Sequence, residues 1–272
     1  MQEKITIGSV PYLNGKPLTR WFRTPEGRAS GIEVVEAPPS QLARMLADSE
    51  ITVALVSSFE SFRSPELACV PGVSISGQDD IRTVCAFSRI PYNMVQSVAM
   101  DTSSLTSVAL LTILLSEVYN VHPQHLAMPP DLESMLAEAD AALLIGDPCM
   151  RADRTGLDVL DLGAAWRRHT GLPFVYALWL GRPENITPRL VDALQTAKEY
   201  GLTQLEEVAR EESERLGNSY QDCYEYVSEI MDYNLDETLL KGLETFREKV
   251  FANNLLGQSR LAGGWSGERL QE

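Results

Sequence analysis

The segment with the clearest potential for chemistry is Asp101-Thr102-Ser103-Ser104-Leu105-Thr106-Ser107, which follows a predicted strand at Ser97–Met100. It begins a long predicted helix that ends near Tyr119. A helix N-terminus exposes unpaired backbone N–H groups and the positive end of the helix dipole. The hydroxyls of Ser104, Thr106 and Ser107 add donors, so this turn, which includes Leu105, is predicted to bind a carboxylate. The alternative is an ordinary N-cap formed by Ser103 or Ser104.

Other polar residues come directly after predicted strands, where ligands bind in open α/β sheets. The turn Ser9-Val10-Pro11-Tyr12-Leu13-Asn14-Gly15-Lys16-Pro17 offers the Tyr12 phenol and the Asn14 amide, although Asn is also a common N-cap. The other candidates at strand ends are Ser9, Ser57, Ser58, Ser76, Thr83, Gly146 and Asp147. Hydroxyl and amide groups favour hydrogen-bonded recognition of a polar ligand over metal or nucleophilic chemistry.

Composition narrows the kind of ligand. The formal net charge of −15 argues against a nucleic acid partner but leaves room for a small anion held by a local field. The sequence has no glycine-rich phosphate loop, Ser/His/Asp set or HExxH helix. Its four cysteines and three histidines lack metal-ligand spacing, so we predict no metal and no cofactor. The thiols are expected to be free and buried, and Cys149 is the best candidate for a reactive one.

Strand and helix alternate along the first half of the chain. Strands are predicted at 4–10, 31–37 and 51–56, with helices at 14–22 and around Leu42, Met45 and Leu46, which gives a parallel sheet with right-handed crossovers. A second series has strands at 97–100, 126–128 and 141–145, with the long helix and a helix at 132–138 between them. An apolar strand at 174–180 precedes helices at 190–200, 205–216, 221–231 and 237–252.

This order predicts an α/β protein with two lobes, a cleft between them and a helical C-terminal segment. Residues 1–85 and 182–272 would form a discontinuous first lobe, and residues 86–181 the second. Two connections, near Arg82–Arg89 and Leu178–Arg182, would cross between the lobes and allow closure on a ligand. No apolar run approaches the roughly 20 residues of a membrane span, and no export signal is evident, so we expect a cytoplasmic protein without membrane contact.

Several segments resemble, in the same order, the menaquinone-biosynthesis family that includes chorismate dehydratase of the futalosine pathway. They are Ile7-Gly8-Ser9-Val10-Pro11-Tyr12-Leu13-Asn14-Gly15-Lys16-Pro17-Leu18, Val53-Ala54-Leu55-Val56-Ser57-Ser58, the 101–107 segment, Leu144-Ile145-Gly146-Asp147 and Trp166-Arg167-Arg168-His169-Thr170-Gly171-Leu172-Pro173-Phe174-Val175. The resemblance implies the fold of type II periplasmic solute-binding proteins. One departure is Gly15, where the family pattern has serine.

The resemblance also implies an activity, the conversion of chorismate to 3-[(1-carboxyvinyl)oxy]benzoate and water. A sister enzyme with the same fold forms 1,4-dihydroxy-6-naphthoate and opens with a Cys-Pro-Asn-Asp segment. Pro11-Tyr12-Leu13-Asn14 here favours the dehydratase. A non-catalytic solute-binding protein for a small carboxylate is the alternative from another class, and the sequence allows a homodimer.

This interpretation assigns roles to the candidate residues. The substrate carboxylates would bind to Ser104–Ser107, Ser57 and Thr83, with Ser9 among the binding residues. Asn14 and Tyr12 would orient the ring and the leaving hydroxyl. The base would be the substrate's own enolpyruvyl carboxylate or Asp147, although a Gly-Asp-Pro turn often uses its Asp to cap the chain.

Overall fold

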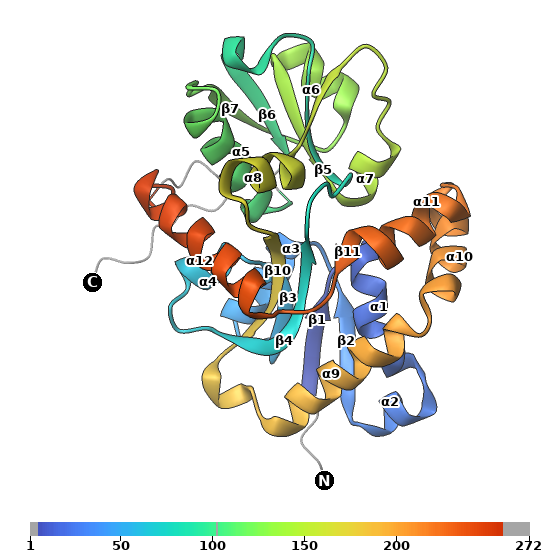
Figure 1. Ribbon diagram of the computed structural model, residues 1–272. Helices are drawn as coiled ribbons and strands as arrows, with labels where there is room; N and C mark the ends of the chain where they lie inside the picture. The colour runs from blue at the N-terminus through green and yellow to red at the C-terminus, as the bar shows by residue number, and fades with distance from the viewer. Residues whose placement is uncertain (1–4, 102, 258–272) are drawn as a thin grey trace.

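The protein forms two β-sheets surrounded by helices, as the computed structural model in Figure 1 shows for residues 5–101 and 103–257. The first sheet has the strand order β11-β4-β10-β3-β1-β2, and the second has the order β7-β6-β8-β5-β9. Lys4 of the first predicted strand, Thr102 of the helix-start segment and residues 258–272 of the tail lie outside the described ranges.

The strands of the first sheet are β1 (Ile5–Ser9), β2 (Ile32–Glu36), β3 (Val53–Ser57), β4 (Ala68–Gly77), β10 (Phe174–Gly181) and β11 (Met231–Asp232). Those of the second are β5 (Val84–Ser88), β6 (Ser97–Asp101), β7 (Gln124–Met128), β8 (Ala141–Ile145) and β9 (Asp158–Asp161). The helices are α1 (Lys16–Thr19), α2 (Pro25–Ala29), α3 (Pro39–Ala47), α4 (Glu60–Arg63), α5 (Leu105–Glu117), α6 (Leu132–Glu138), α7 (Gly146–Arg151), α8 (Leu162–Thr170), α9 (Pro188–Leu202), α10 (Leu205–Leu216), α11 (Tyr220–Glu225) and α12 (Glu237–Ala252).

The predicted strand–helix alternation is confirmed in both sheets. Strand β1 pairs in parallel with β2 and β3, and β6 pairs in parallel with β7 and β8. Every residue of β3 and β8 is buried, which matches the apolar runs 53–56 and 141–145. Because parallel strands end on the same side of a sheet, the residues after β1 and β3 lie together, as do those after β6 and β8.

Strand β4 was not predicted, because it contains Pro71 and Gly72, which are rare within strands. The structure accommodates both residues at an irregularity in the pairing of β4 with β10. The register changes there from Ser74 opposite Leu178 to Cys69 opposite Leu180, so the pair falls in a bulge where no regular ladder bond is needed. Strands β5 and β9 and helix α8 were also missed.

The second crossing between the sheets was predicted too late in the chain. The whole of β10 pairs with β3 and β4, so the stretch 178–182 belongs to the first sheet and the chain crosses before Phe174. The first crossing lies between Gly77 and Val84, where the N–H groups of Ile81 and Arg82 donate to the Asp161 carboxylate. The lobe division at residues 85 and 181 stays a prediction, and sheet membership favours moving β10 to the first lobe.

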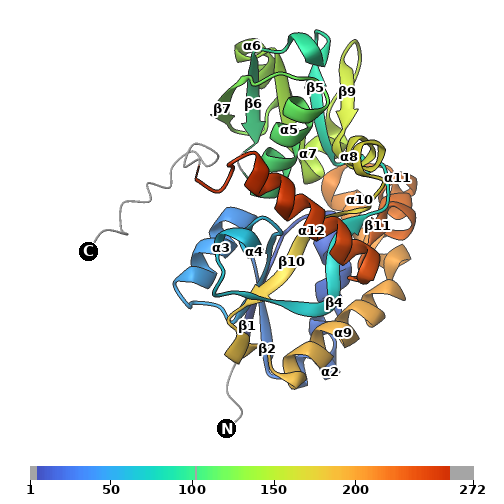
Figure 2. The ribbon, with the colours of Figure 1, turned by 60° about the vertical axis from the view of Figure 1, so that its left-hand side comes forward.

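Two predicted helices differ from the observed ones. Residues 13–23 form a 3₁₀ turn, the short helix α1 and a second 3₁₀ turn. The predicted helix 221–231 consists of α11, a π-helical turn at Tyr226–Ile230 and the short strand β11. Helix α12, by contrast, has the predicted bounds. It packs on β10 of the first sheet and on α5 of the second, and Figure 2 shows it lying across both.

Candidate active site

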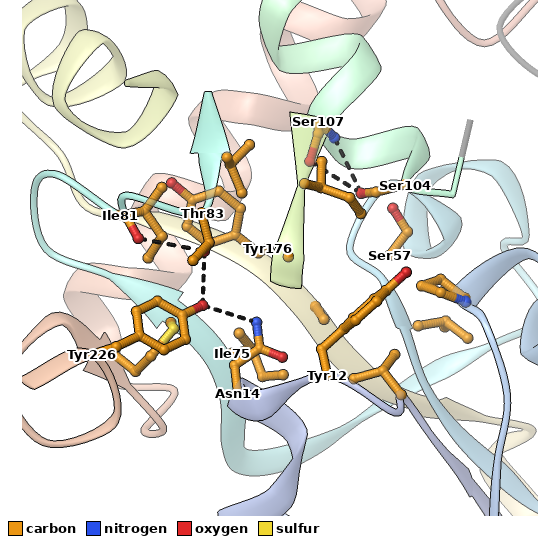
Figure 3. A pocket seen from close by; sticks show the side chains of 18 residues that line it. Tyr12, Asn14, Ser57, Ile75, Ile81, Thr83, Ser104, Ser107, Tyr176 and Tyr226 are labelled. Carbon is orange, nitrogen blue, oxygen red and sulfur yellow. Dashed lines mark hydrogen bonds between the residues drawn. The ribbon is translucent and has the colours of Figure 1, made fainter. Parts of the chain in front are cut away.

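A pocket lies between the two sheets, lined by residues from both (Figure 3). The space between its walls measures about 550 Å³, open solvent included. Its lining consists of Val10, Tyr12, Asn14, Pro39, Val56, Ser57, Ile75, Ile81, Thr83, Val84, Ser104, Ser107, Ile145, Gly146, Tyr176, Ala177, Tyr226 and Met231. No charged side chain is among these described residues, so the polar groups of the pocket are neutral hydroxyls, phenols and one amide.

The pocket gathers six of the ten residues predicted for the site. Tyr12, Asn14, Ser57, Thr83, Ser104 and Ser107 line it. The other four, Ser9, Leu105, Thr106 and Asp147, lie outside the lining. Ser9 is fully buried at the end of β1, and its Oγ has no hydrogen-bond partner in the described part of the chain.

At the start of α5, Ser104 serves both as the helix cap and as part of the pocket. Its Oγ accepts hydrogen bonds from Ser107 N at 3.3 Å and from Ser107 Oγ at 3.2 Å. Because Ser104 Oγ only accepts in these two bonds, its own proton is free to be donated to a ligand. The two interpretations of this segment, N-cap and binding site, therefore hold for the same residue.

Thr106 turns away from the pocket and links the two sheets. Its backbone N–H donates to Ser57 Oγ at 2.7 Å, and its Oγ1 makes a short hydrogen bond with the same hydroxyl. Oγ1 also accepts from Phe59 N at 3.1 Å. The N–H groups of Thr106 and Ser107 are thus already bonded within the protein. The donors left at this end of the pocket are mainly hydroxyls, which corrects the emphasis that the sequence analysis placed on backbone N–H groups.

Tyr12 contacts the second sheet through Gly146. A Cβ on Gly146 would lie 3.2 Å from the Tyr12 ring, and Gly146 has φ of 58°, so both its small size and its backbone conformation are needed. Burial raises the pKa of the Tyr12 phenol, a hydrogen bond with Ser103 opposes this rise, and the carboxyl of Asp101 adds to it. Tyr12 is therefore a neutral phenol at pH 7 and can donate a hydrogen bond.

Asn14 belongs to a hydrogen-bonded group that includes a residue the sequence analysis missed. Its Nδ2 donates to Tyr226 Oη at 3.2 Å, and Tyr226 Oη lies 2.8 Å from Thr83 Oγ1 (Figure 3). Tyr226 stands on the π-helical turn and is 3% exposed, and burial raises the pKa of its phenol. Tyr176 and Met231 also line the pocket and were not predicted. Their positions depend on the pairing of β10, β4 and β11, which no local pattern reveals.

Asp147 is buried and bonded by two donors from the other side of the cleft. Oδ1 accepts from Leu13 N at 3.2 Å, and Oδ2 accepts from Arg215 Nη2 at 3.0 Å. Arg215 is held in turn by Glu212 through Nε at 2.6 Å. This arrangement fits the structural role considered for the Gly-Asp-Pro turn. Asp147 joins α7 of the second sheet to the first turn after β1 and to α10.

The glycine at position 15, where the resemblance led us to expect serine, also has a local reason. A Cβ at Gly15 would lie 2.9 Å from both Val10 Cγ2 and the Val10 carbonyl oxygen. A serine would require the backbone of this turn to shift. The departure therefore alters the packing beneath Tyr12 and Asn14 and does not remove a contact of the pocket itself.

The described residues contain no group of three or more His, Cys, Asp or Glu side chains placed to hold a metal ion. All four cysteines are free, and three of them, including Cys149, are buried. In residues 5–101 and 103–257, no helix is both long and apolar enough to cross a membrane.

The fold places the protein in a known structural class. It superposes on a protein of Archaeoglobus fulgidus with a TM-score of 0.74 at 16% identity, covering 92% of this chain and 98% of the other. The periplasmic aliphatic sulphonate-binding protein of Escherichia coli gives a TM-score of 0.65 at 14% identity, covering 100% and 96%. The protein therefore has the two-lobed periplasmic-binding-protein fold, as predicted.

Sequence comparison then identifies the family. Residues 5–252 match the model of the menaquinone biosynthesis family. The chorismate dehydratase of Thermus thermophilus is 33% identical over 263 residues, which cover 90% of this chain and 94% of that protein. The chorismate dehydratase of Campylobacter jejuni is 28% identical over 178 residues, covering 63% and 65%. The chain belongs to the menaquinone biosynthesis family.

Proposed function

We propose that the protein is a chorismate dehydratase, a hydro-lyase that forms 3-[(1-carboxyvinyl)oxy]benzoate and water. The observation that carries the proposal is a pocket between two sheets, in which the polar side chains among the described lining residues are all neutral donors and acceptors. Two family members with substantial sequence identity bear this name. The cytoplasmic location and the homodimer predicted from the sequence are part of the same proposal.

The proposed reaction requires little of the protein beyond holding the reacting groups of the substrate in position. The ring carbon that bears the enolpyruvyl ether loses its proton, and the C–O bond of the hydroxyl on the adjacent ring carbon breaks. The electron pair of the broken C–H bond forms the double bond that completes the aromatic ring. The proton and the hydroxide together make the water that is released. Because aromatisation drives the reaction forward, holding the reacting groups in place can supply several kcal/mol of the catalysis.

The lining residues divide between the two ends of such a substrate. Ser57, Ser104 and Ser107 stand together at one end, where a carboxylate would accept from the free proton of Ser104. Tyr12 and Asn14 would orient the ring and its leaving hydroxyl. Uncharged donors suit this task, because they hold an anion without the cost of desolvating a second, opposite charge.

No side chain in the lining is an obvious base. Asp147 lies outside the lining and is bonded to Leu13 and Arg215, so we assign it a positioning role. The enolpyruvyl carboxylate of the substrate then remains as the group that takes the ring proton. This carboxylate belongs to the ether substituent on the carbon that loses the proton, so it is held close to that proton.

The test is incubation of the purified protein with chorismate, followed by chromatography and mass spectrometry. Appearance of a product lighter by one water supports the proposal. Tight binding without conversion would instead indicate a solute-binding protein, and neither binding nor conversion would favour the sister naphthoate synthase. The Asn14→Asp variant, purified in the same way, controls for a contaminating enzyme.

A further inference from the structure

Tyr226 reaches the pocket from the C-terminal segment, 212 positions after its hydrogen-bond partner Asn14. It is nearly fully buried, and it stands at the first position of the π-helical turn Tyr226–Ile230. Such turns are uncommon and occur frequently at functional sites. The phenol belongs to a chain of hydrogen bonds that connects Asn14 with Thr83.

The Asn14 end of this chain has a defined direction. Asn14 Nδ2 donates to Tyr226 Oη at 3.2 Å, so the phenol oxygen accepts from the amide and the amide nitrogen faces Tyr226. Tyr226 Oη also lies 2.8 Å from Thr83 Oγ1, and either hydroxyl of this pair can be the donor. Thr83 therefore holds the phenol in the position from which it contacts Asn14.

This orientation leaves the other end of the amide facing the pocket. Asn14 Oδ1 is buried and has no hydrogen-bond partner in the described part of the protein, and Figure 3 shows it turned toward the space beside Tyr12. A buried carbonyl oxygen without a partner is unfavourable, because it has lost its hydrogen bonds to water. A ligand that places an O–H or N–H donor there would recover this energy.

We propose that Tyr226 and Thr83 are positioning residues that fix Asn14 as a hydrogen-bond acceptor for the ring hydroxyl of the substrate. The inference rests on the proposed function. Both carboxylates of chorismate are acceptors at neutral pH, so its ring hydroxyl is the one donor that it can offer Asn14 Oδ1. The dehydrated product has lost this hydroxyl and cannot satisfy the amide. The pocket is therefore built to distinguish the substrate from its own product.

The experiment compares the KM for chorismate with the inhibition constant of the product. In the Tyr226→Phe variant, Asn14 loses its acceptor and its amide can turn. We expect KM to rise roughly threefold to tenfold, the effect of one hydrogen bond, while the inhibition constant of the product stays within about twofold. Thr83→Val removes the hydroxyl that bonds to Tyr226 and should shift the ratio of KM to the product inhibition constant in the same direction. Thr83→Ser keeps the hydroxyl and should restore the wild-type ratio.

The matched control is Tyr233→Phe, which removes the hydroxyl of another buried tyrosine that lies outside the pocket lining. It should leave both constants unchanged. Wild-type protein that does not dehydrate chorismate would overturn the proposed function and the substrate named here. Wild-type activity combined with equal changes of KM and product inhibition in Tyr226→Phe and Thr83→Val would overturn this inference alone. If Tyr226→Phe does not fold, the comparison of Thr83→Val with Thr83→Ser decides it.

Discussion

Substitution of Asp147 by asparagine separates the two roles considered for this residue. Asparagine keeps an oxygen for Leu13 N–H but loses the charge that pairs with Arg215. A hydrogen bond to a charged group contributes about 1.5–3 kcal/mol. Because the Arg215 side chain is 47% exposed, solvent screening reduces the expected loss to about 1 kcal/mol. If closure of the pocket depends on this contact, KM should rise about fivefold and kcat should change by less than about threefold.

A catalytic base would behave differently, because its removal lowers kcat by about 10²–10⁴-fold. Steady-state kinetics of chorismate dehydration at several substrate concentrations distinguish the two cases. Arg215→Gln should reproduce the effect on KM, and the double variant should show less than the sum of the two single effects, since both act on one contact. A hundredfold loss of kcat at unchanged KM in Asp147→Asn, with Arg215→Gln unaffected, would refute our assignment.

Three other substitutions give distinct outcomes. Asn14→Asp should cut turnover at least roughly tenfold with unchanged thermal unfolding, because a carboxylate repels the dianionic substrate and cannot donate to the phenol beside it; wild-type turnover would remove Asn14 from the mechanism. Thr106→Val leaves the buried N–H of Phe59 without its acceptor and should lower the free energy of unfolding by about 1–3 kcal/mol in urea titrations, whereas Thr106→Ser should not. Burial alone would raise the pKa of Glu117, but hydrogen bonds led by Lys249 hold it below its ordinary value of 4.5. A lowered pKa stabilises the fold above pH 4.5, and this contribution is lost as the pH falls through the folded value. Glu117→Gln should therefore cost about 1 kcal/mol at pH 7 and progressively less as the pH falls below 4.5, and a loss that does not change with pH would contradict the ion-pair explanation.

The parts of the site that could be predicted from sequence are those formed by short segments. Ser104 and Ser107 were identifiable because hydroxyl residues between a strand and an apolar helix have few structural alternatives. Tyr12 and Asn14 follow β1 directly, so the strand alone places them at the edge of the sheet. In each case one secondary-structure boundary determines where the side chain lies.

The missed residues depend on contacts between distant segments. Tyr226 meets Thr83 across 143 positions, and the helical periodicity of residues 221–231 gave no sign of the π-helical turn that points the phenol inward. Asp147 illustrates a different limit. Its place after a buried strand matches the rule for catalytic residues, but its carboxylate also accepts from Arg215 of helix α10, which no local pattern reveals. Whether a polar residue at a strand end faces the ligand or a partner helix is therefore decided by tertiary packing.

The absence of charge in the lining of the pocket has a consequence for recognition. Substrate and product of the proposed reaction carry the same two carboxylates, so contacts of these groups with Ser57, Ser104 and Ser107 would stabilise both to a similar degree. Such contacts do not distinguish the substrate from its product. Discrimination must involve the group that changes, the ring hydroxyl. Among the described residues of the lining, Asn14 Oδ1 and Tyr176 Oη are buried without a partner, and our proposal is that the ring hydroxyl is recognised at the Asn14 amide and not at the hydroxyls of the α5 turn.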